Sequence, residues 1–247
     1  MKYVSPRVTT FILEDIALEA LTADEVQARL LEFLRSKTPH HLITVNPEYL
    51  VEAHRNTQFR SVLKAADMAL IDGGGIVFMA LLRGLKVSLR QRMTGVALTE
   101  MLLKMATAHD KRILIVLPTD SLTNNAKLHD ALRSRYPSLH ASILTEPDAA
   151  ACAAERPDIL LCAYGSPRQD LWLAETVKKI PGLSIAAGVG GTFDFISGTM
   201  RRAPRLLRHL GLEWFWRLIQ EPRRRFPRIF RAVIVFPLLA LRHHHHE

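Results

Sequence analysis

The stretch ADMALIDGGGIVFMALL, residues 66–82, brings a carboxylate to a position where α/β proteins bind ligands. An apolar run ends just before Asp72, three glycines follow, and a second apolar segment begins at Ile76. This pattern predicts a buried strand that leads through glycines into a helix. Backbone N–H groups and the N-terminus of the helix face the crevice at such a point. Asp72 is therefore a candidate ligand-site residue, and the alternative is that its side chain only caps the helix.

Four other apolar runs alternate with helix-like segments. The runs are HLITV (41–45), RILIVL (112–117), DILLCAYG (158–165) and LSIAAGVGG (183–191). The alternation predicts βαβ units in an α/β fold with a Rossmann-like, mostly parallel sheet and helices on both faces. Because the carboxyl ends of parallel strands lie along one edge, polar residues and glycines at these ends should converge. The residues expected there are Thr44, Asn46, Asp72, Gly165 to Gln169 and Gly188 to Asp194.

The composition fits one large domain with an appendage. The chain has 247 residues, of which 48% are hydrophobic, and such a chain can bury a sizeable core. Its net charge of +9 is concentrated towards the C-terminus, where residues 201–242 hold 11 arginines against Glu213 and Glu221. We therefore expect an α/β domain at residues 1–200 and a basic helical appendage at residues 201–242.

The arginines of residues 201–242 are interleaved with tryptophans and phenylalanines. Arginine suits phosphate contacts and aromatic rings suit an interface, so this segment could meet an anionic membrane, a nucleic acid or a phosphorylated substrate. A solvated charged helix is the alternative. The apolar run at 232–241 is shorter than the roughly 20 residues that span a bilayer, and Pro237 interrupts it. An amphipathic helix in the plane of the membrane, with Phe236 towards lipid, is the better interpretation.

Several common ligand classes are not indicated by the sequence. It has no G-x-G-x-x-G after the first strand and no G-x-x-x-x-G-K-[ST], so neither a dinucleotide site nor a P-loop is predicted. It has no D-x-D pair and no clustered histidines, so we expect no metal and no cofactor, and protein groups must neutralise any phosphate. Cys152 and Cys162 lack paired spacing and are typical of a reduced, cytosolic protein.

Six segments carry a resemblance to a known family. They are TVNPE (44–48), DMALIDGGGIV (67–77), RMTG (92–95), GSPRQDLW (165–172), GVGGTFDFISGTMRRAP (188–204) and LGLEWFWRLIQEPRR (210–224). In their order and spacing they resemble the WecG/TagA/CpsF glycosyltransferases, glycosyltransferase family 26, over about residues 10–230.

The resemblance implies a reaction and its partners. Members of the family transfer a sugar from a UDP-sugar, with inversion and without a metal, to a polyprenyl-diphosphate-linked saccharide. The donor sugar is of the N-acetylmannosamine, N-acetylmannosaminuronic acid or glucose type. The chain is then expected to be a peripheral protein on the cytoplasmic face of the bacterial inner membrane, with no nucleic-acid partner. The resemblance leaves open whether it forms a homo-oligomer.

The resemblance also assigns roles around the candidate carboxylate. Asp72 takes the place of the family's proposed catalytic base, which accepts the proton of the acceptor hydroxyl during attack on the anomeric carbon. Gly73 and the glycines after it would let the sugar approach the backbone closely. Thr44 and Asn46 match a polar pair that lines the same pocket, and the alternative is that they are strand-end turn residues.

Further residues are implied to contact the substrates. Gln169 would contact the donor or the acceptor, unless it is only an exposed glutamine at a helix start. Asp194 would meet the uracil, where a carboxylate can accept from the ring N–H, unless it is a structural turn residue. Arg217 and Arg224 match arginines that fold over the donor diphosphate, with contact to lipid headgroups as the alternative. The substrate-binding set also includes Gly165 and Gly191.

The sequence departs from the family's pattern at three positions. Ala97 stands where aspartate is frequent, and Asp170 replaces the usual glutamate. Pro227 stands where arginine is frequent, and Arg228 could substitute for it. These differences concern the choice of acceptor and the geometry of the appendage more than the reaction class.

Two other functional classes stay open. A nucleic-acid-binding protein would show a salt-dependent affinity for oligonucleotides and no turnover of a UDP-sugar. A non-catalytic scaffold of a membrane polysaccharide complex would tolerate Asp72→Asn. The presence of Asp72, Thr44 and Asn46 together weighs against the scaffold.

Overall fold

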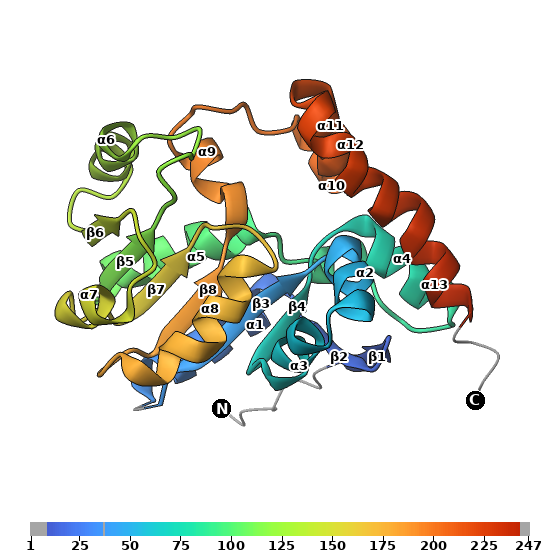
Figure 1. Cartoon of the computed structure of the whole chain (residues 1–247), viewed down its shortest axis with the longest axis horizontal. Coiled ribbons are helices and arrows are strands. Elements are labelled where there is room, and N and C mark those ends of the chain that lie inside the picture. The colour runs from blue at the N-terminus through green and yellow to red at the C-terminus, as the bar shows by residue number, and fades with distance from the viewer. Residues whose placement is uncertain (1–8, 37, 243–247) are drawn as a thin grey trace.

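The computed structural model describes residues 9–36 and 38–242, and it describes only the backbone of Thr9, His209, Arg224, Arg228, Leu241 and Arg242. Within these residues one eight-stranded sheet runs through the molecule (Figure 1). The strands are β1 (Thr9–Leu13), β2 (Ile16–Ala20), β3 (His40–Val45), β4 (Met68–Ile71), β5 (Arg112–Val116), β6 (His140–Leu144), β7 (Ile159–Cys162) and β8 (Ile185–Gly188).

The sheet has the order β1-β2-β4-β3-β8-β7-β5-β6. The β1–β2 pair is antiparallel, and the other six pairs are parallel. Strands β1 to β4 build one side of the sheet and strands β5 to β8 build the other, and the two sides meet where β3 pairs with β8. The predicted α/β class with a mostly parallel sheet is confirmed.

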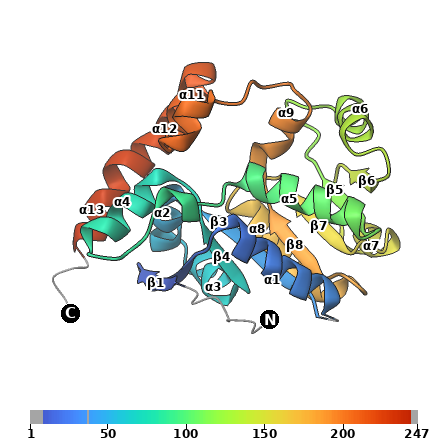
Figure 2. The same ribbon diagram turned by 180° about the vertical axis from the view of Figure 1, so that it is seen from behind.

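Helices cover both faces of the sheet. They are α1 (Ala23–Arg35), α2 (Pro47–Arg55), α3 (Thr57–Ala65), α4 (Gly74–Leu82), α5 (Gly95–Ala108), α6 (Asn125–Arg135), α7 (Ala149–Ala154), α8 (Arg168–Thr176) and α9 (Phe193–Ile196). Successive strand residues point to opposite faces. Leu42 and Leu70 join the core under α1 and α5, which lie in front of the sheet in Figure 2. Ile43 and Ile71 join the core under α2, α3 and α4 on the opposite face.

The C-terminal appendage is helical, as predicted. It comprises α10 (Arg205–His209), α11 (Glu213–Gln220), α12 (Pro222–Phe230), a π-helical turn (Arg231–Val235) and α13 (Phe236–Arg242). It extends along the edge of the molecule past α2 and α4 (Figures 1 and 2). The guanidinium of Arg83, just after α4, donates a 2.7 Å hydrogen bond to the carbonyl of Ala240, which ties α13 to the α/β domain.

One expectation about the appendage is wrong. Phe236, which was expected to face lipid, is 1% exposed and packs with Ala240 into the core around α2. The side chains that do face outwards come from the other side of the appendage helices, where Phe226, Phe230 and Leu238 are 64%, 50% and 58% exposed. A helix of this length packs one face on the domain, and sequence alone did not tell which face that is.

Candidate active site

The carboxyl ends of β3, β4, β7 and β8 open into one cavity of about 820 Å³, which the appendage closes on its far side. The residues predicted from sequence that line this cavity are Thr44, Asn46, Asp72, Gly73, Gly165, Gln169, Gly191, Asp194 and Arg217. The convergence at one sheet edge is therefore as expected. The side chain of Arg224, the remaining predicted residue, lies outside the described part of the structure.

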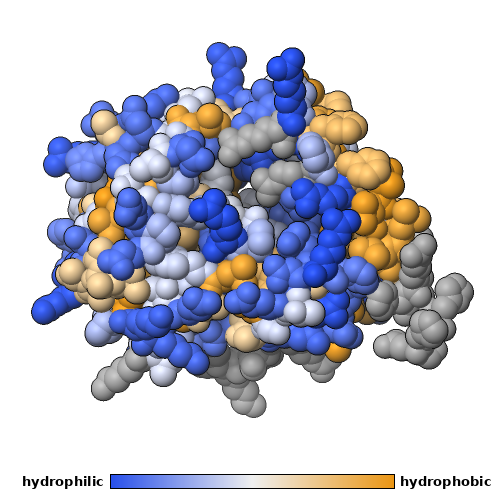
Figure 3. Space-filling model, viewed as in Figure 1, coloured by the Kyte–Doolittle hydropathy of each residue, from blue (hydrophilic) through white to orange (hydrophobic). Residues whose placement is uncertain are grey.

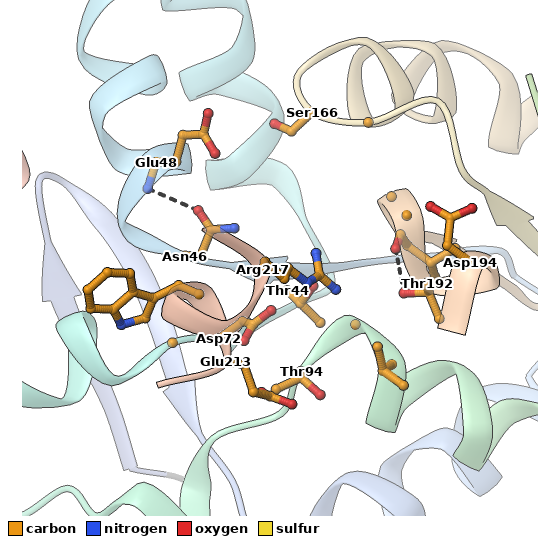
Figure 4. Close-up of a pocket in the computed structure, with 18 of the residues that line it drawn as sticks. Thr44, Asn46, Glu48, Asp72, Thr94, Ser166, Thr192, Asp194, Glu213 and Arg217 are labelled. Atoms are coloured by element: carbon orange, nitrogen blue, oxygen red, sulfur yellow. Dashed lines mark hydrogen bonds between the residues drawn. The ribbon is translucent and has the colours of Figure 1, made fainter. Parts of the chain in front are cut away.

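Asp72 lies at the end of β4, and its backbone is held by the neighbouring strand. Its N–H donates a 2.7 Å hydrogen bond to the carbonyl of Val45 at the end of β3. The alternative role of helix cap does not apply, because Gly73 is the N-cap of α4 and no side chain caps that helix. The carboxylate instead belongs to the cavity lining, among side chains from several elements (Figure 4).

The surroundings of Asp72 make it a stronger base than an ordinary aspartate. Burial raises the pKa of the carboxyl group to about 6, although Arg92 and Arg217 counteract this rise. Glu213 adds to the rise, and the backbone N–H of Gly95 opposes it. At neutral pH the group is mainly ionised and is ready to accept a proton.

The glycines after Asp72 permit close packing of protein against protein. A Cβ on Gly75 would lie 2.9 Å from Cγ of Pro47, at the start of α2. Gly211 of the appendage packs on Gly74, and a Cβ on Gly211 would lie 3.3 Å from the Gly74 Cα. Gly73 has a φ of +100°, which favours glycine. The close approach of a sugar to these glycines stays a prediction.

Thr44 and Asn46, the polar pair at the end of β3, have different surroundings. Asn46 is the N-cap of α2, and its Oδ1 accepts hydrogen bonds from the backbone N–H groups of Glu48 and Tyr49 at 2.9 and 3.2 Å. Its amide nitrogen points towards the middle of the pocket in Figure 4. Thr44 is buried on the cavity floor close to Gly95. Asn46 thus caps the helix that follows β3 and also lines the cavity.

Gln169 braces the loops that follow β7 and β8. Its Oε1 accepts from the N–H of Gly165 at 2.9 Å and from that of Gly190 at 3.0 Å. Its Nε2 donates to the hydroxyl of Tyr49 at 3.1 Å. The side chain is 1% exposed, so it is not the exposed helix-start residue of the alternative interpretation. Contact with a substrate stays a prediction for Gln169.

Asp170, one of the departures from the family's pattern, is completely buried beneath this brace. Burial raises the pKa of its carboxyl group to about 7. A Cβ on Gly188 would lie 2.4 Å from Oδ1 of Asp170 and 2.4 Å from Nε2 of Gln169. The strand β8 therefore has to end in glycine for these two side chains to fit.

Asp194 is held at the start of α9. Its Oδ1 accepts a 2.8 Å hydrogen bond from the hydroxyl of Thr123, which also lies 2.9 Å from the Ser197 hydroxyl. Gly191 packs on the other carboxylate oxygen of Asp194, because a Cβ on Gly191 would lie 3.1 Å from Oδ2 of Asp194. Contact of Asp194 with uracil stays a prediction. Thr123 was missed, although the polar stretch after the 112–117 strand could have indicated it.

Arginines from both parts of the chain reach the cavity. Arg217 comes from α11, and its guanidinium stacks 4.5 Å above the ring of Phe195. Arg92 comes from the segment before α5, where the N–H of the next residue, Met93, donates a 2.8 Å hydrogen bond to the carbonyl of Ile71 beside Asp72. Arg92 belongs to the RMTG segment, but no role for it was predicted from the sequence. Further arginines that line the cavity are Arg168, Arg202 and Arg225.

This charge distribution suits an anionic ligand. Guanidinium groups form paired hydrogen bonds with phosphate oxygens, and they stabilise negative charge that develops on a leaving diphosphate. Among the described residues no group of three or more His, Cys, Asp or Glu side chains could hold a metal ion. The cavity thus combines the buried carboxylate of Asp72 with cationic side chains.

Comparisons with known proteins agree with this chemistry. The family model described as "Glycosyl transferase WecG/TagA/CpsF family" matches residues 11–247. A Bacillus spizizenii protein named N-acetylglucosaminyldiphosphoundecaprenol N-acetyl-beta-D-mannosaminyltransferase is 30% identical over 190 residues, which cover 74% of this chain and 72% of the relative. Proteins of the same name from Bacillus subtilis strain 168 and Staphylococcus aureus strain MW2 are 30% and 26% identical. These matches cover 72% and 74% of this chain, and 71% and 73% of the relatives.

Proposed function

Because the chain belongs to the WecG/TagA/CpsF family and is a glycosyltransferase, we propose that it transfers a sugar from a UDP-sugar to a polyprenyl-diphosphate-linked saccharide. The relatives' names favour N-acetylmannosamine as the sugar and N-acetylglucosaminyl-diphosphoundecaprenol as the acceptor. The uronic acid of that sugar and glucose are the other donors that we would test.

The observation that carries this proposal is that Asp72, Arg92 and Arg217 line one cavity and that both arginines act on the Asp72 carboxyl group. Transfer of a sugar from a nucleotide diphosphate needs a proton acceptor for the attacking hydroxyl and positive charge for the departing diphosphate. Asp72 would supply the first, and Arg92 and Arg217, which line the same cavity, would supply the second. A pocket for a neutral ligand would not need both.

The proposed reaction proceeds in one displacement. The acceptor hydroxyl oxygen forms a bond to the anomeric carbon, while the bond from that carbon to the diphosphate oxygen breaks and its electron pair leaves with UDP. Asp72 takes the hydroxyl proton, and Arg92 and Arg217 stabilise the negative charge on the diphosphate. Attack opposite to the leaving group inverts the anomeric configuration. The arginines supply the charge stabilisation that a divalent ion would otherwise give, so we propose a metal-independent reaction.

We further propose that the enzyme docks on the cytoplasmic face of the inner membrane, because a polyprenyl-linked acceptor stays in the bilayer. No described helix is long and apolar enough to span a membrane. The exposed apolar side chains of α4 and the appendage form what we call the docking face. It comprises Phe78, Leu81 and Leu82 of α4 with Trp214, Phe215, Ile219, Phe226, Phe230, Val233, Ile234 and Leu238.

The shape and charge of this region fit a lipid surface. In Figure 3 apolar side chains gather at the edge of the molecule where α4, α12 and α13 lie side by side in Figures 1 and 2. Basic residues near an anionic leaflet contribute roughly 1 kcal/mol each, so the arginines of residues 201–242 favour reversible binding that salt weakens. The contribution of α4 to the docking face was not predicted from the sequence, which indicated only the appendage as the membrane-binding segment.

A screen of donors tests the function directly. UDP-sugars are incubated with purified protein and a short-chain lipid-diphosphate-linked N-acetylglucosamine, and the product is identified by mass. We expect the acceptor mass to rise by one N-acetylhexosamine residue with UDP-N-acetylmannosamine. Absence of transfer from every donor would contradict the proposal.

Three further measurements test metal independence and distinguish the enzyme from a non-catalytic scaffold and from a nucleic-acid-binding protein. EDTA should leave the initial rate unchanged, and loss that manganese restores would contradict metal independence. Asp72→Asn should be inactive, whereas a non-catalytic scaffold would not depend on that carboxylate. A labelled oligonucleotide should not bind at physiological salt, whereas a nucleic-acid-binding protein would retain it.

A further inference from the structure

Glu213, the first residue of α11, belongs to the appendage. Its side chain is a second carboxylate in the cavity, beside that of Asp72 (Figure 4). The position of α11 is fixed by the contact of Gly211 with Gly74, two residues after Asp72. Neither glycine has a side chain to separate the two backbones. The appendage thus contacts the turn that follows Asp72 just before Glu213.

Arg92 of the α/β domain connects this carboxylate to the rest of the appendage. Its Nη2 atom lies 3.5 Å from Oε2 of Glu213 and donates a 2.8 Å hydrogen bond to the carbonyl of Arg208. The Arg92 side chain is 10% exposed and that of Glu213 is 21% exposed, so water screens the pair less than it would at the surface.

Three charged side chains shift the pKa of Asp72 most strongly among the described residues. Arg92 comes from the segment before α5, and Glu213 and Arg217 come from α11. The N–H of Gly95 is the neutral group that favours the carboxylate. A carboxylate that faces two arginines and no counter-charge would be strongly stabilised, and it would be a poor proton acceptor.

We infer that Glu213 is a positioning residue that keeps Asp72 basic by pairing with Arg92 when the appendage is docked. The inference rests on the proposed function of Asp72 as the base. The negative charge of Glu213 partly offsets the positive charge of Arg92, so Arg92 stabilises the Asp72 carboxylate less than it would alone. Because Glu213 belongs to the appendage, docking of α11 supplies Arg217 for the diphosphate and sets the basicity of Asp72 at the same time.

A simpler role for Glu213 would be to anchor α11 through an ion pair. Both roles predict that its loss lowers turnover. They differ in the pH profile, because an anchor leaves the proton affinity of Asp72 unchanged when the appendage stays docked. An electrostatic partner of the base moves the acidic limb of kcat/KM, the pH range in which the base becomes protonated.

The test is the pH dependence of kcat/KM with a water-soluble acceptor for the wild type and four single variants. Glu213→Gln removes a negative charge near Asp72 and keeps the shape, so the acidic limb should move to lower pH and the plateau should fall. Arg92→Gln removes a positive charge, so the limb should move the opposite way, to higher pH. Glu213→Asp keeps the charge and should leave the limb at the wild-type position.

Glu221→Gln is the matched control, because Glu221 lies at the other end of α11 and pairs with Arg225 at 3.0 Å. Its limb should coincide with that of the wild type. The inference would be overturned if Glu213→Gln left the acidic limb at the wild-type position. It would also be overturned if the limb moved in the same direction in Glu213→Gln and in Arg92→Gln. If Glu213→Gln does not fold, as judged by circular dichroism, the shift in Arg92→Gln and the wild-type limb in Glu213→Asp decide the outcome. A wild type without transfer at any pH would refute the proposed function itself.

Discussion

At the scale of single residues, the chemistry of the cavity depends on the surroundings of one carboxylate. Asp72 follows a buried strand, so its backbone is fixed by the sheet while its side chain faces the cavity. Burial raises its pKa to about 6, and the arginines beside it limit the rise. The result is a group that is ionised at neutral pH and is still a better proton acceptor than an aspartate in water.

We expect Asp72→Asn to lower turnover by about two to four orders of magnitude, because asparagine keeps the size of the side chain but cannot accept the proton. The measurement is product formation with a soluble acceptor, alongside circular dichroism to confirm the fold. A variant that keeps more than about a tenth of the wild-type turnover would place the base elsewhere.

The pH profile gives a second prediction at this scale. The base must be deprotonated to act, so kcat/KM of the wild type should be constant above about pH 7 and fall below a pKa of about 6. On the acidic side the fall should approach tenfold per pH unit. A profile that stays flat down to pH 4.5 would show that no group with this pKa controls the reaction.

At the scale of elements, the approach of α11 to α4 decides whether the site is complete. Gly211 has a φ of +74° and packs on Gly74, so the N-terminus of α11 lies close to the turn that follows Asp72. Arg217 and Glu213 are carried into the cavity by this contact. A separation of the two glycines would move both charged side chains away from Asp72.

Gly211→Ala should therefore lower turnover, because its Cβ would lie 3.3 Å from the Gly74 Cα in addition to the strain of a positive φ. Gly182→Ala is the matched control, since Gly182 has a φ of +79° and its added Cβ would meet no atom within 4 Å. The positive φ should cost each variant roughly 1 kcal/mol of stability in thermal unfolding, and Gly211→Ala should lose more because of its additional contact with Gly74. Equal turnover in the two variants would show that the glycine contact does not control the site.

At the scale of the whole molecule, the appendage has one face that packs on the α/β domain and one face that is exposed. Its inner face packs on α2 and α4 and buries Phe236 and Ala240. Its outer face continues the exposed apolar side chains of α4 into one docking face. The appendage contributes residues both to the cavity and to this docking face. We therefore expect membrane binding to affect how the appendage completes the site.

We expect Leu238→Glu to weaken binding to anionic liposomes and to leave turnover of a water-soluble acceptor near the wild-type value, since Leu238 is 58% exposed. Phe236→Glu, two residues away, should instead lower the melting temperature, because it places a charge in the core. Liposome sedimentation and thermal unfolding distinguish the two. Unchanged liposome binding of Leu238→Glu would remove the outer face of α13 from the docking face.

The sequence determined the features that depend on neighbouring residues in the chain. The alternation of apolar runs and helices predicted the parallel sheet, and the strand ends predicted that Thr44, Asp72 and Gln169 would meet at one edge. The length of the 232–241 run excluded a spanning helix in this segment. The β1–β2 hairpin was missed, because its two short runs are separated only by Glu14 and Asp15, which both adopt a positive φ.

Only the tertiary structure decided which side chains from distant segments meet. Arg92 and Glu213 are 121 positions apart, and nothing in either segment indicates that their side chains form an ion pair beside Asp72. The burial of Phe236 likewise depends on α2, against which α13 packs. Local patterns specify that a helix has an apolar face, but the partner that covers this face belongs to another part of the chain. The pairing of charges and faces is therefore a property of the assembled fold.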